Sequence, residues 1–139
     1  MLSTKSGMSA SDETVHPAKA TIAWEGDSRE VLDQRASEVR SDIGYPLWRL
    51  QKGESPDLST RPMQSIGHGV FELKAEDTAA WYRVIYLARI ENTIYVLDSF
   101  TKKSRKTEKN DLNRARARLS NVRQRLQKER SDAKGKRNK

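Results

Sequence analysis

The sequence predicts an α+β fold in which helices pack on an antiparallel sheet. Three runs rich in Val, Ile, Tyr and Phe follow one another within residues 66–103, and polar turn residues separate them. Such runs are typical of an antiparallel meander. Two stretches with apolar residues at helical spacing precede the meander, and a third follows it. A length of 139 residues suits one small domain and its core.

The middle run of the meander, residues 80–88, shows which side chains share a face. Successive side chains of a strand point to opposite sides, so Tyr82 and Val84 face one way and Arg83 faces the other. Arg83 thus lies among apolar neighbours, where a charge is costly unless an anion or a carboxylate meets it. It is therefore either a contact for a bound anion or one partner of a structural salt bridge.

The part of the chain before the meander predicts a tail, a strand and a helical hairpin. Residues 1–18 are small and polar, so a disordered tail without a signal peptide is expected. Residues 20–24 predict a strand that could join the meander as a fourth strand. Asp27 is placed to cap a helix that ends at Gly44, and Pro46 suits the first turn of a second helix. The two helices predict a hairpin that covers one face of the sheet.

A loop directly precedes the meander, and a basic helix follows it. Residues 54–67 contain two prolines and no periodic pattern, which indicates a long loop that carries Arg61. After the meander, a helix capped by Thr107 has an apolar seam of alternating three- and four-residue spacing. Residues 128–139 predict a disordered basic tail, so the folded domain is expected to span residues 19–127. Arginines cover most of the remaining helix surface: Arg114, Arg116, Arg118, Arg123 and Arg125.

The positive charge of the chain is concentrated at its C-terminal end. Residues 1–101 hold 11 Lys and Arg against 15 Asp and Glu, whereas residues 102–139 hold 16 against 4. A one-ended cationic segment suits a polyanion such as nucleic acid. The alternative is a solvated basic helix and tail that binds nothing.

The composition excludes several kinds of site. The chain has no cysteine, which excludes disulfides, thiolate nucleophiles and cysteine-based zinc sites. Two histidines make a histidine-rich metal centre unexpected, and no apolar run has the length of a membrane span. A cytoplasmic protein without a metal or a cofactor is the expectation.

Five motifs, taken together and in order, resemble the phage-derived HigB-like toxins of the RelE superfamily over roughly residues 20–120. The resemblance implies a small RelE-like α+β domain, with an N-terminal strand and a helical hairpin packed on a three- to four-stranded antiparallel sheet and a basic C-terminal helix after it. The motifs are GYPLWRLQKG at 44–53, RPM at 61–63, GHGVFEL at 67–73, YRVIY at 82–86 and VLDSFTKKS at 96–104.

The resemblance also implies an activity and partners. Such toxins belong to type II toxin–antitoxin systems and cleave mRNA endonucleolytically, commonly on the ribosome. The expected partners are therefore a helix-turn-helix antitoxin, with a heterotetramer as one expected assembly, and ribosome-bound mRNA. No membrane partner is expected.

Carried over residue by residue, the resemblance nominates catalytic candidates. Arg83 falls where related toxins have a phosphate-binding arginine, and Lys74 matches a basic position on the first meander strand. Lys102 and Lys103 fall where relatives have a basic residue after the last strand. Asp98 stands where the motif usually has histidine, which removes an obvious proton-transfer group.

The remaining candidates follow from residue type. His68 is the one histidine expected within the folded region, and the reference pKa of a histidine side chain lies near neutrality. A surface turn is the preferred interpretation of His68. The other cations predicted to bind RNA are Arg61, Arg105 and Lys106.

These residues suggest how RNA could be cleaved without a metal. The 2′-hydroxyl attacks the adjacent phosphorus, which requires a base, an acid and cations that stabilise the charged phosphorane. An arginine such as Arg83 binds phosphate oxygens in a bidentate manner. A lysine could act as the base only if burial or crowding lowered its pKa. Asp98 is expected to be exposed and to orient a lysine, with its pKa lowered by Lys102 and Lys103.

Two alternatives to cleavage remain open. The departure at Asp98 favours a protein of the same fold that occupies RNA or the ribosome without cleaving RNA. The other alternative is a gyrase-inhibiting toxin related to ParE, against which Arg83 and the lysine pair argue because gyrase inhibition needs no phosphate-cleaving cluster.

Overall fold

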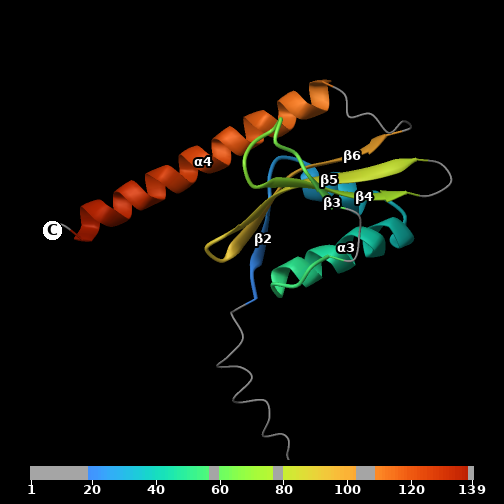
Figure 1. The fold of residues 1–139 in the computed structure, drawn as a ribbon, viewed down its shortest axis with the longest axis horizontal. Helices are drawn as coiled ribbons and strands as arrows, with labels where there is room; N and C mark the ends of the chain where they lie inside the picture. The colour runs from blue at the N-terminus through green and yellow to red at the C-terminus, as the bar shows by residue number, and fades with distance from the viewer. Residues whose placement is uncertain (1–18, 57–59, 77–79, 103–108, 138–139) are drawn as a thin grey trace, which may run out of the picture.

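A five-stranded sheet with helices on both faces forms the domain (Figure 1). The computed structural model describes residues 19–56, 60–76, 80–102 and 109–137. The strand order is β2-β6-β5-β4-β3. The strands are β2 (Thr21–Trp24), β3 (Thr60–Pro62), β4 (Val70–Glu76), β5 (Trp81–Ile90) and β6 (Thr93–Lys102), and the helices are α2 (Ser28–Asp33), α3 (Ser37–Gln51) and α4 (Lys109–Arg137).

The α+β architecture and the meander are confirmed, and the sheet is larger than expected. β4, β5 and β6 pair antiparallel in chain order. β2 joins them at one edge and runs parallel to β6, with Thr21 opposite Thr93. β3 adds the other edge, with Arg61 opposite Glu72. The sequence pattern missed β3 because three residues around a proline show no alternation.

The helical hairpin is divided at a different place from the one expected. The break falls between α2 and α3, at residues 34–36, and α3 continues through Gly44 and Pro46. Ile43 and Leu47 lie on either side of this pair and are both buried against the sheet. Tertiary packing therefore outweighs the weak local preference of glycine and proline for a helix end. Asp27 is the N-cap residue of α2, as predicted, but its side chain makes no capping hydrogen bond.

Each face of the sheet has its own apolar core. α3 lies along one face and α4 along the other (Figure 1). The core on the α3 face is built from Ala20, Leu32, Ile43, Leu47, Leu73, Ala75, Val84, Tyr86, Ile94 and Val96. The core on the α4 face is built from Met63, Ile66, Val70, Ile85, Leu87, Leu97, Phe100, Ala115, Leu119 and Val122.

α4 is longer than predicted, and its C-terminal part extends beyond the sheet. The predicted seam is confirmed at Ala115, Leu119 and Val122, which are buried, while Leu112 and Leu126 pack at its margins. Residues 128–137, expected to be a disordered tail, are the last turns of this helix. The helix extends past the sheet in Figure 1, and its side chains from 127 to 135 are exposed. The expected tail at 1–18 and the capping residue Thr107 lie outside the described residues.

Candidate functional site

Charged side chains lie on the α4-facing side of the sheet, next to the apolar core. The alternation of β4 puts Glu72 and Lys74 on the same side as Val70, and that of β5 puts Arg83 on the same side as Ile85. Lys74 and Arg83 are direct cross-strand partners. Like charges directly opposite each other destabilise a sheet, so this arrangement requires a carboxylate nearby. Glu72 provides that carboxylate.

Glu72 joins two arginines from different strands. Its Oε1 accepts a hydrogen bond from Nε of Arg61 at 3.1 Å, and its Oε2 accepts one from Nη1 of Arg83 at 3.0 Å. Glu72 and Arg83 are each only 2% exposed, whereas the Arg61 side chain is 59% exposed. The three side chains thus form a chain of charges that runs from the interior of the sheet face to its surface.

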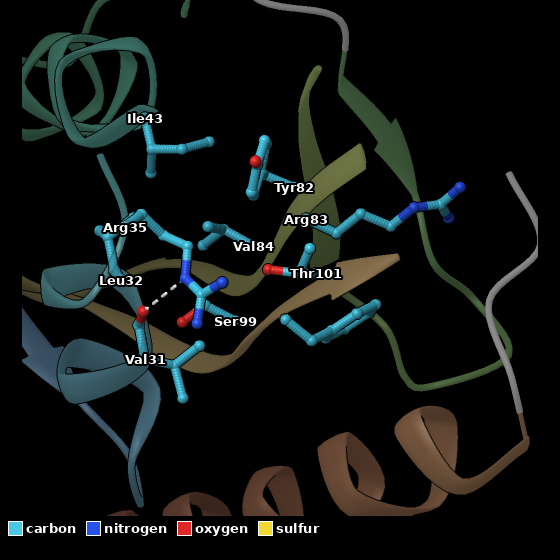
Figure 2. A pocket seen from close by; sticks show the side chains of 10 residues that line it. Val31, Leu32, Arg35, Ile43, Tyr82, Arg83, Val84, Ser99 and Thr101 are labelled. Atoms are coloured by element: carbon cyan, nitrogen blue, oxygen red, sulfur yellow. Dashed lines mark hydrogen bonds between the residues drawn. The ribbon is translucent and has the colours of Figure 1, made fainter. Parts of the chain in front are cut away.

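Arg83 is therefore one partner of a buried salt bridge, which is the structural alternative that the sequence left open. The pattern of β5 explains this burial: in Figure 2, Tyr82 and Val84 point toward Ile43 of α3, and Arg83 leaves the strand in the opposite direction. The small cavity drawn there has a volume of about 10 Å³. A cavity of this size holds at most about one water molecule, so it is no substrate site.

Lys74 and Trp81 form the second part of the group. The ammonium of Lys74 lies 4.8 Å from the centre of the Trp81 ring, within the range of a cation–π contact. Both side chains are partly exposed. Lys102 is the last residue of β6, and its backbone pairs with Trp81. Lys103, Arg105 and Lys106 lie outside the described residues.

We call Arg61, Glu72, Lys74, Trp81 and Arg83 the cationic group. It contains three cations and one carboxylate, which leaves two positive charges in excess among these five side chains. The sequence pointed to Arg61, Lys74 and Arg83 but missed Glu72. A signal was present, because Glu72 lies two residues before Lys74 on the same strand and must share its face.

His68 lies away from the cationic group. It is exposed in the turn before β4, and its carbonyl oxygen accepts a hydrogen bond from Arg123 of α4 at 2.8 Å. Val70, where β4 begins, and Lys74 lie roughly 13 Å apart at the usual rise of a strand. The geometry gives the His68 imidazole no place beside Lys74 or Arg83.

Asp98 is a buried member of an ion-pair network with α4. Its side chain is 1% exposed. Oδ2 accepts a hydrogen bond from Nε of Arg114 at 2.8 Å, and Oδ1 accepts one from Nη1 of Arg118 at 3.0 Å. The expectation of an exposed carboxylate is therefore wrong.

The electrostatic surroundings of Asp98 also differ from the expected ones. Burial raises its pKa, while the hydrogen bond and charge of Arg114 and the charge of Arg118 act in the opposite direction. The predicted lowering of this pKa is wrong, because the effect of burial outweighs that of the two arginines. Asp98 thus attaches α4 to the sheet.

Several other arginines of α4 also contact the domain. Arg118 donates to the carbonyl oxygen of Leu97 and to Asp27, and Arg125 donates to both oxygens of Glu25 at 2.8 and 2.9 Å. Arg116 donates to the carbonyl oxygen of Ser65. Much of the charge on the first part of α4 is therefore used in fixing the helix to the sheet.

A comparison with known protein families is consistent with this fold. The sequence profile described as "Phage derived protein Gp49-like (DUF891)" matches residues 30–120. No curated protein has a significantly similar sequence. Among the described residues, no helix is both long and apolar enough to cross a membrane. Because the profile covers more than half of the chain, the protein belongs to the Gp49-like family of phage-derived proteins, a family of RelE/HigB-like toxins.

Proposed function

We propose that this protein is the toxin of a type II toxin–antitoxin system and cleaves mRNA, in the cytoplasm and on the ribosome. The observation that carries the proposal is the cationic group, with its excess of two positive charges beside a partly exposed tryptophan. Phosphate is the ligand that clustered arginine and lysine side chains favour. An aromatic ring next to such a cluster can stack on an unpaired base.

The proposed chemistry is attack of the 2′-hydroxyl on the adjacent phosphorus, with departure of the 5′ oxygen. The cations of the group would stabilise the charge of the phosphorane. Among the described residues of the group, Lys74 is the proposed proton-transfer group, because arginine stays protonated and Glu72 is buried in ion pairs with both arginines. Lys102 and Lys103 remain proposed contributors through their place at and just after the end of β6.

A specific observation favours a second candidate function. Asp98 stands where the resemblance led us to expect a histidine, and it is buried and bound to Arg114 and Arg118. A group sealed in this way cannot reach a substrate. A toxin that occupies RNA or the ribosome without cleaving RNA would therefore share the cationic group and lack the chemistry.

An experiment in cells separates these two candidates. Induced expression of the wild type should arrest growth and produce new 5′ ends in translated mRNA. Lys74→Met should reduce both effects, because it removes a charge and the proposed proton-transfer group. Arg40→Gln is the matched control, since Arg40 is an exposed cation of α3 on the other side of the sheet. Growth arrest with intact mRNA would favour occupation without cleavage, and normal growth with intact mRNA would refute the proposed function.

The proposed partner is a helix-turn-helix antitoxin that binds the cationic group. Carboxylates of the antitoxin would neutralise the excess charge and exclude RNA by direct competition. A complex of two toxins and two antitoxins is the assembly proposed with it.

A further inference from the structure

The three charged side chains Arg61, Glu72 and Arg83 differ sharply in their access to a ligand. Arg83 and Glu72 are almost fully buried, and Arg61 is mostly exposed. A phosphate that approaches this face of the sheet therefore meets Arg61 before it can meet Arg83. The sequence motifs favoured Arg83 over Arg61 as the phosphate-binding arginine, whereas the exposure of the two side chains favours Arg61.

The hydrogen bond to Glu72 fixes how Arg61 presents its donors. A guanidinium has five N–H donors in a planar fork. The Nε–H of Arg61 is taken by Glu72, and among the described residues no acceptor pairs with its two Nη groups. Those two groups form the edge of the fork that binds phosphate oxygens in a bidentate manner.

Arg83 supplies a positive charge beside the buried carboxylate of Glu72. A buried carboxylate is strongly unfavourable unless a cation and hydrogen bonds compensate it. Arg83 meets Glu72 at 3.0 Å from the adjacent strand. Glu72 thus pairs with the buried Arg83 through one carboxylate oxygen and with the exposed Arg61 through the other.

From this geometry we infer that Glu72 is a positioning residue that aims Arg61 at the scissile phosphate, and that Arg83 neutralises Glu72 rather than contacting the RNA. This inference rests on the proposed function and assigns the phosphate contact within it. Arg61 is then the catalytic cation of the group, and its ligand is a phosphodiester of single-stranded RNA.

The test uses purified full-length protein and measures kcat and KM for cleavage of one ribosome-bound mRNA. Arg61→Gln removes the phosphate contact and should lower kcat by roughly 10²-fold, a usual effect of losing one donor to a charged transition state. Arg61→Lys keeps the charge but loses the planar fork, and should not restore the rate. Arg40→Gln should behave as wild type.

A second variant tests the positioning by Glu72 and removes the ion pair as a whole. Glu72→Gln alone would take away the carboxylate that contacts the buried Arg83 and could prevent folding, whereas Glu72→Gln/Arg83→Met removes both charges and keeps the net charge of the protein. Replacing a buried pair by neutral side chains is often tolerated. The double variant should keep the melting temperature within a few degrees, keep KM within about twofold and lower kcat at least about tenfold, because Arg61 remains but is no longer held.

The outcomes separate the inference from the proposed function. Cleavage by Arg61→Gln at the rate of Arg40→Gln would overturn the inference alone, as would a folded double variant with wild-type kcat. A wild type that neither binds nor cleaves RNA would overturn the proposed function and the inference together. If the wild type binds RNA without cleaving it, the quantity to compare among the variants is the affinity for RNA. In that case Arg61→Gln should weaken binding of a single-stranded RNA, and unchanged binding would overturn the inference.

Discussion

Asp98 of β6 and Arg114 of α4 form a direct hydrogen-bonded ion pair at 2.8 Å, with the Asp98 side chain buried and the Arg114 side chain 40% exposed. This pair joins the last strand of the sheet to the helix that covers it. Arg118, one turn further along α4, binds the other carboxylate oxygen at 3.0 Å. The position at which the resemblance led us to expect a histidine therefore serves here to attach α4.

The first prediction concerns the stability that Asp98 provides. Asp98→Asn should lower the free energy of unfolding by about 3 kcal/mol, the low end for breaking a buried ion pair. The low end is expected because Arg114 keeps Asp111 and Arg118 keeps Asp27 as partners. Urea unfolding followed by circular dichroism measures the change.

Asp33→Asn is the control for that measurement, because Asp33 pairs with Arg29 on the surface of α2. Such exposed pairs contribute about 0–1 kcal/mol. Equal midpoints for the two variants would refute a structural role for Asp98. The same argument applies to Asp98→His, which should also lower the free energy of unfolding.

The second prediction concerns Tyr86 at alkaline pH. Burial raises the pKa of Tyr86 from 10.0 to about 12. The unfolded chain therefore loses its phenolic proton first, and the stability that Tyr86 contributes is present below pH 10 and is lost as pH rises toward 12. At about 1.4 kcal/mol per pH unit, the loss is at most about 3 kcal/mol.

Tyr86→Phe should remove this part of the alkaline destabilisation. The measurement compares the unfolding midpoints of wild type and variant between pH 9 and about pH 12, with the difference between them growing across that interval. Tyr95→Phe serves as the comparison, since Tyr95 lies at the margin of the other core. Parallel curves for wild type and Tyr86→Phe would show that the phenol is not protected by burial.

The third prediction concerns the free end of α4. Truncation after Leu126 should leave the fold intact, because the buried positions of α4 end at Val122 and Leu126 only packs at the margin of the core. The removed segment carries six Lys and Arg against two acidic residues. RNA affinity should therefore fall, and the slope of log affinity against log salt should become shallower. An unchanged slope would make this segment a solubilising extension.

The fourth prediction concerns the antitoxin. In the complex, Arg61 and Lys74 should lose solvent exposure and pair with carboxylates of the antitoxin. Arg61→Glu should then weaken the complex by roughly 2–5 kcal/mol, the usual cost of disrupting an interfacial charge pair. Isothermal titration measures this change, with Arg40→Glu as the control for net charge. The prediction would be contradicted if the antitoxin covered the exposed rings of Tyr45 and Trp48 on α3 and left Arg61 accessible to solvent.

The regular elements were predictable because their signals are local. The three strands of the meander follow from β-forming runs, and the seam of α4 follows from its spacing. The division of α2 from α3 was not predictable, because Gly44 and Pro46 continue a helix only when Ile43 and Leu47 gain a buried partner. β3 is an edge strand of three residues that exists through its pairing with β4.

The candidate site was predictable only in part, for a similar reason. Alternation along β5 isolates Arg83, yet it cannot say whether a carboxylate or a phosphate meets the guanidinium. That answer depends on Glu72 of the neighbouring strand. The contacts of Asp98 depend on how α4 crosses β6, and no pattern within either element encodes that crossing.

The late position of α4 in the chain has a consequence for synthesis. Ala115, Leu119 and Val122 complete the core on one side of the sheet, yet all the strands precede them in the sequence. During translation the N-terminal elements emerge first. The apolar residues of β4, β5 and β6 on that side therefore stay exposed to water until residues 109–126 of α4 have also left the ribosome. Until then, a nascent chain is open to chaperones and to association with other copies of itself.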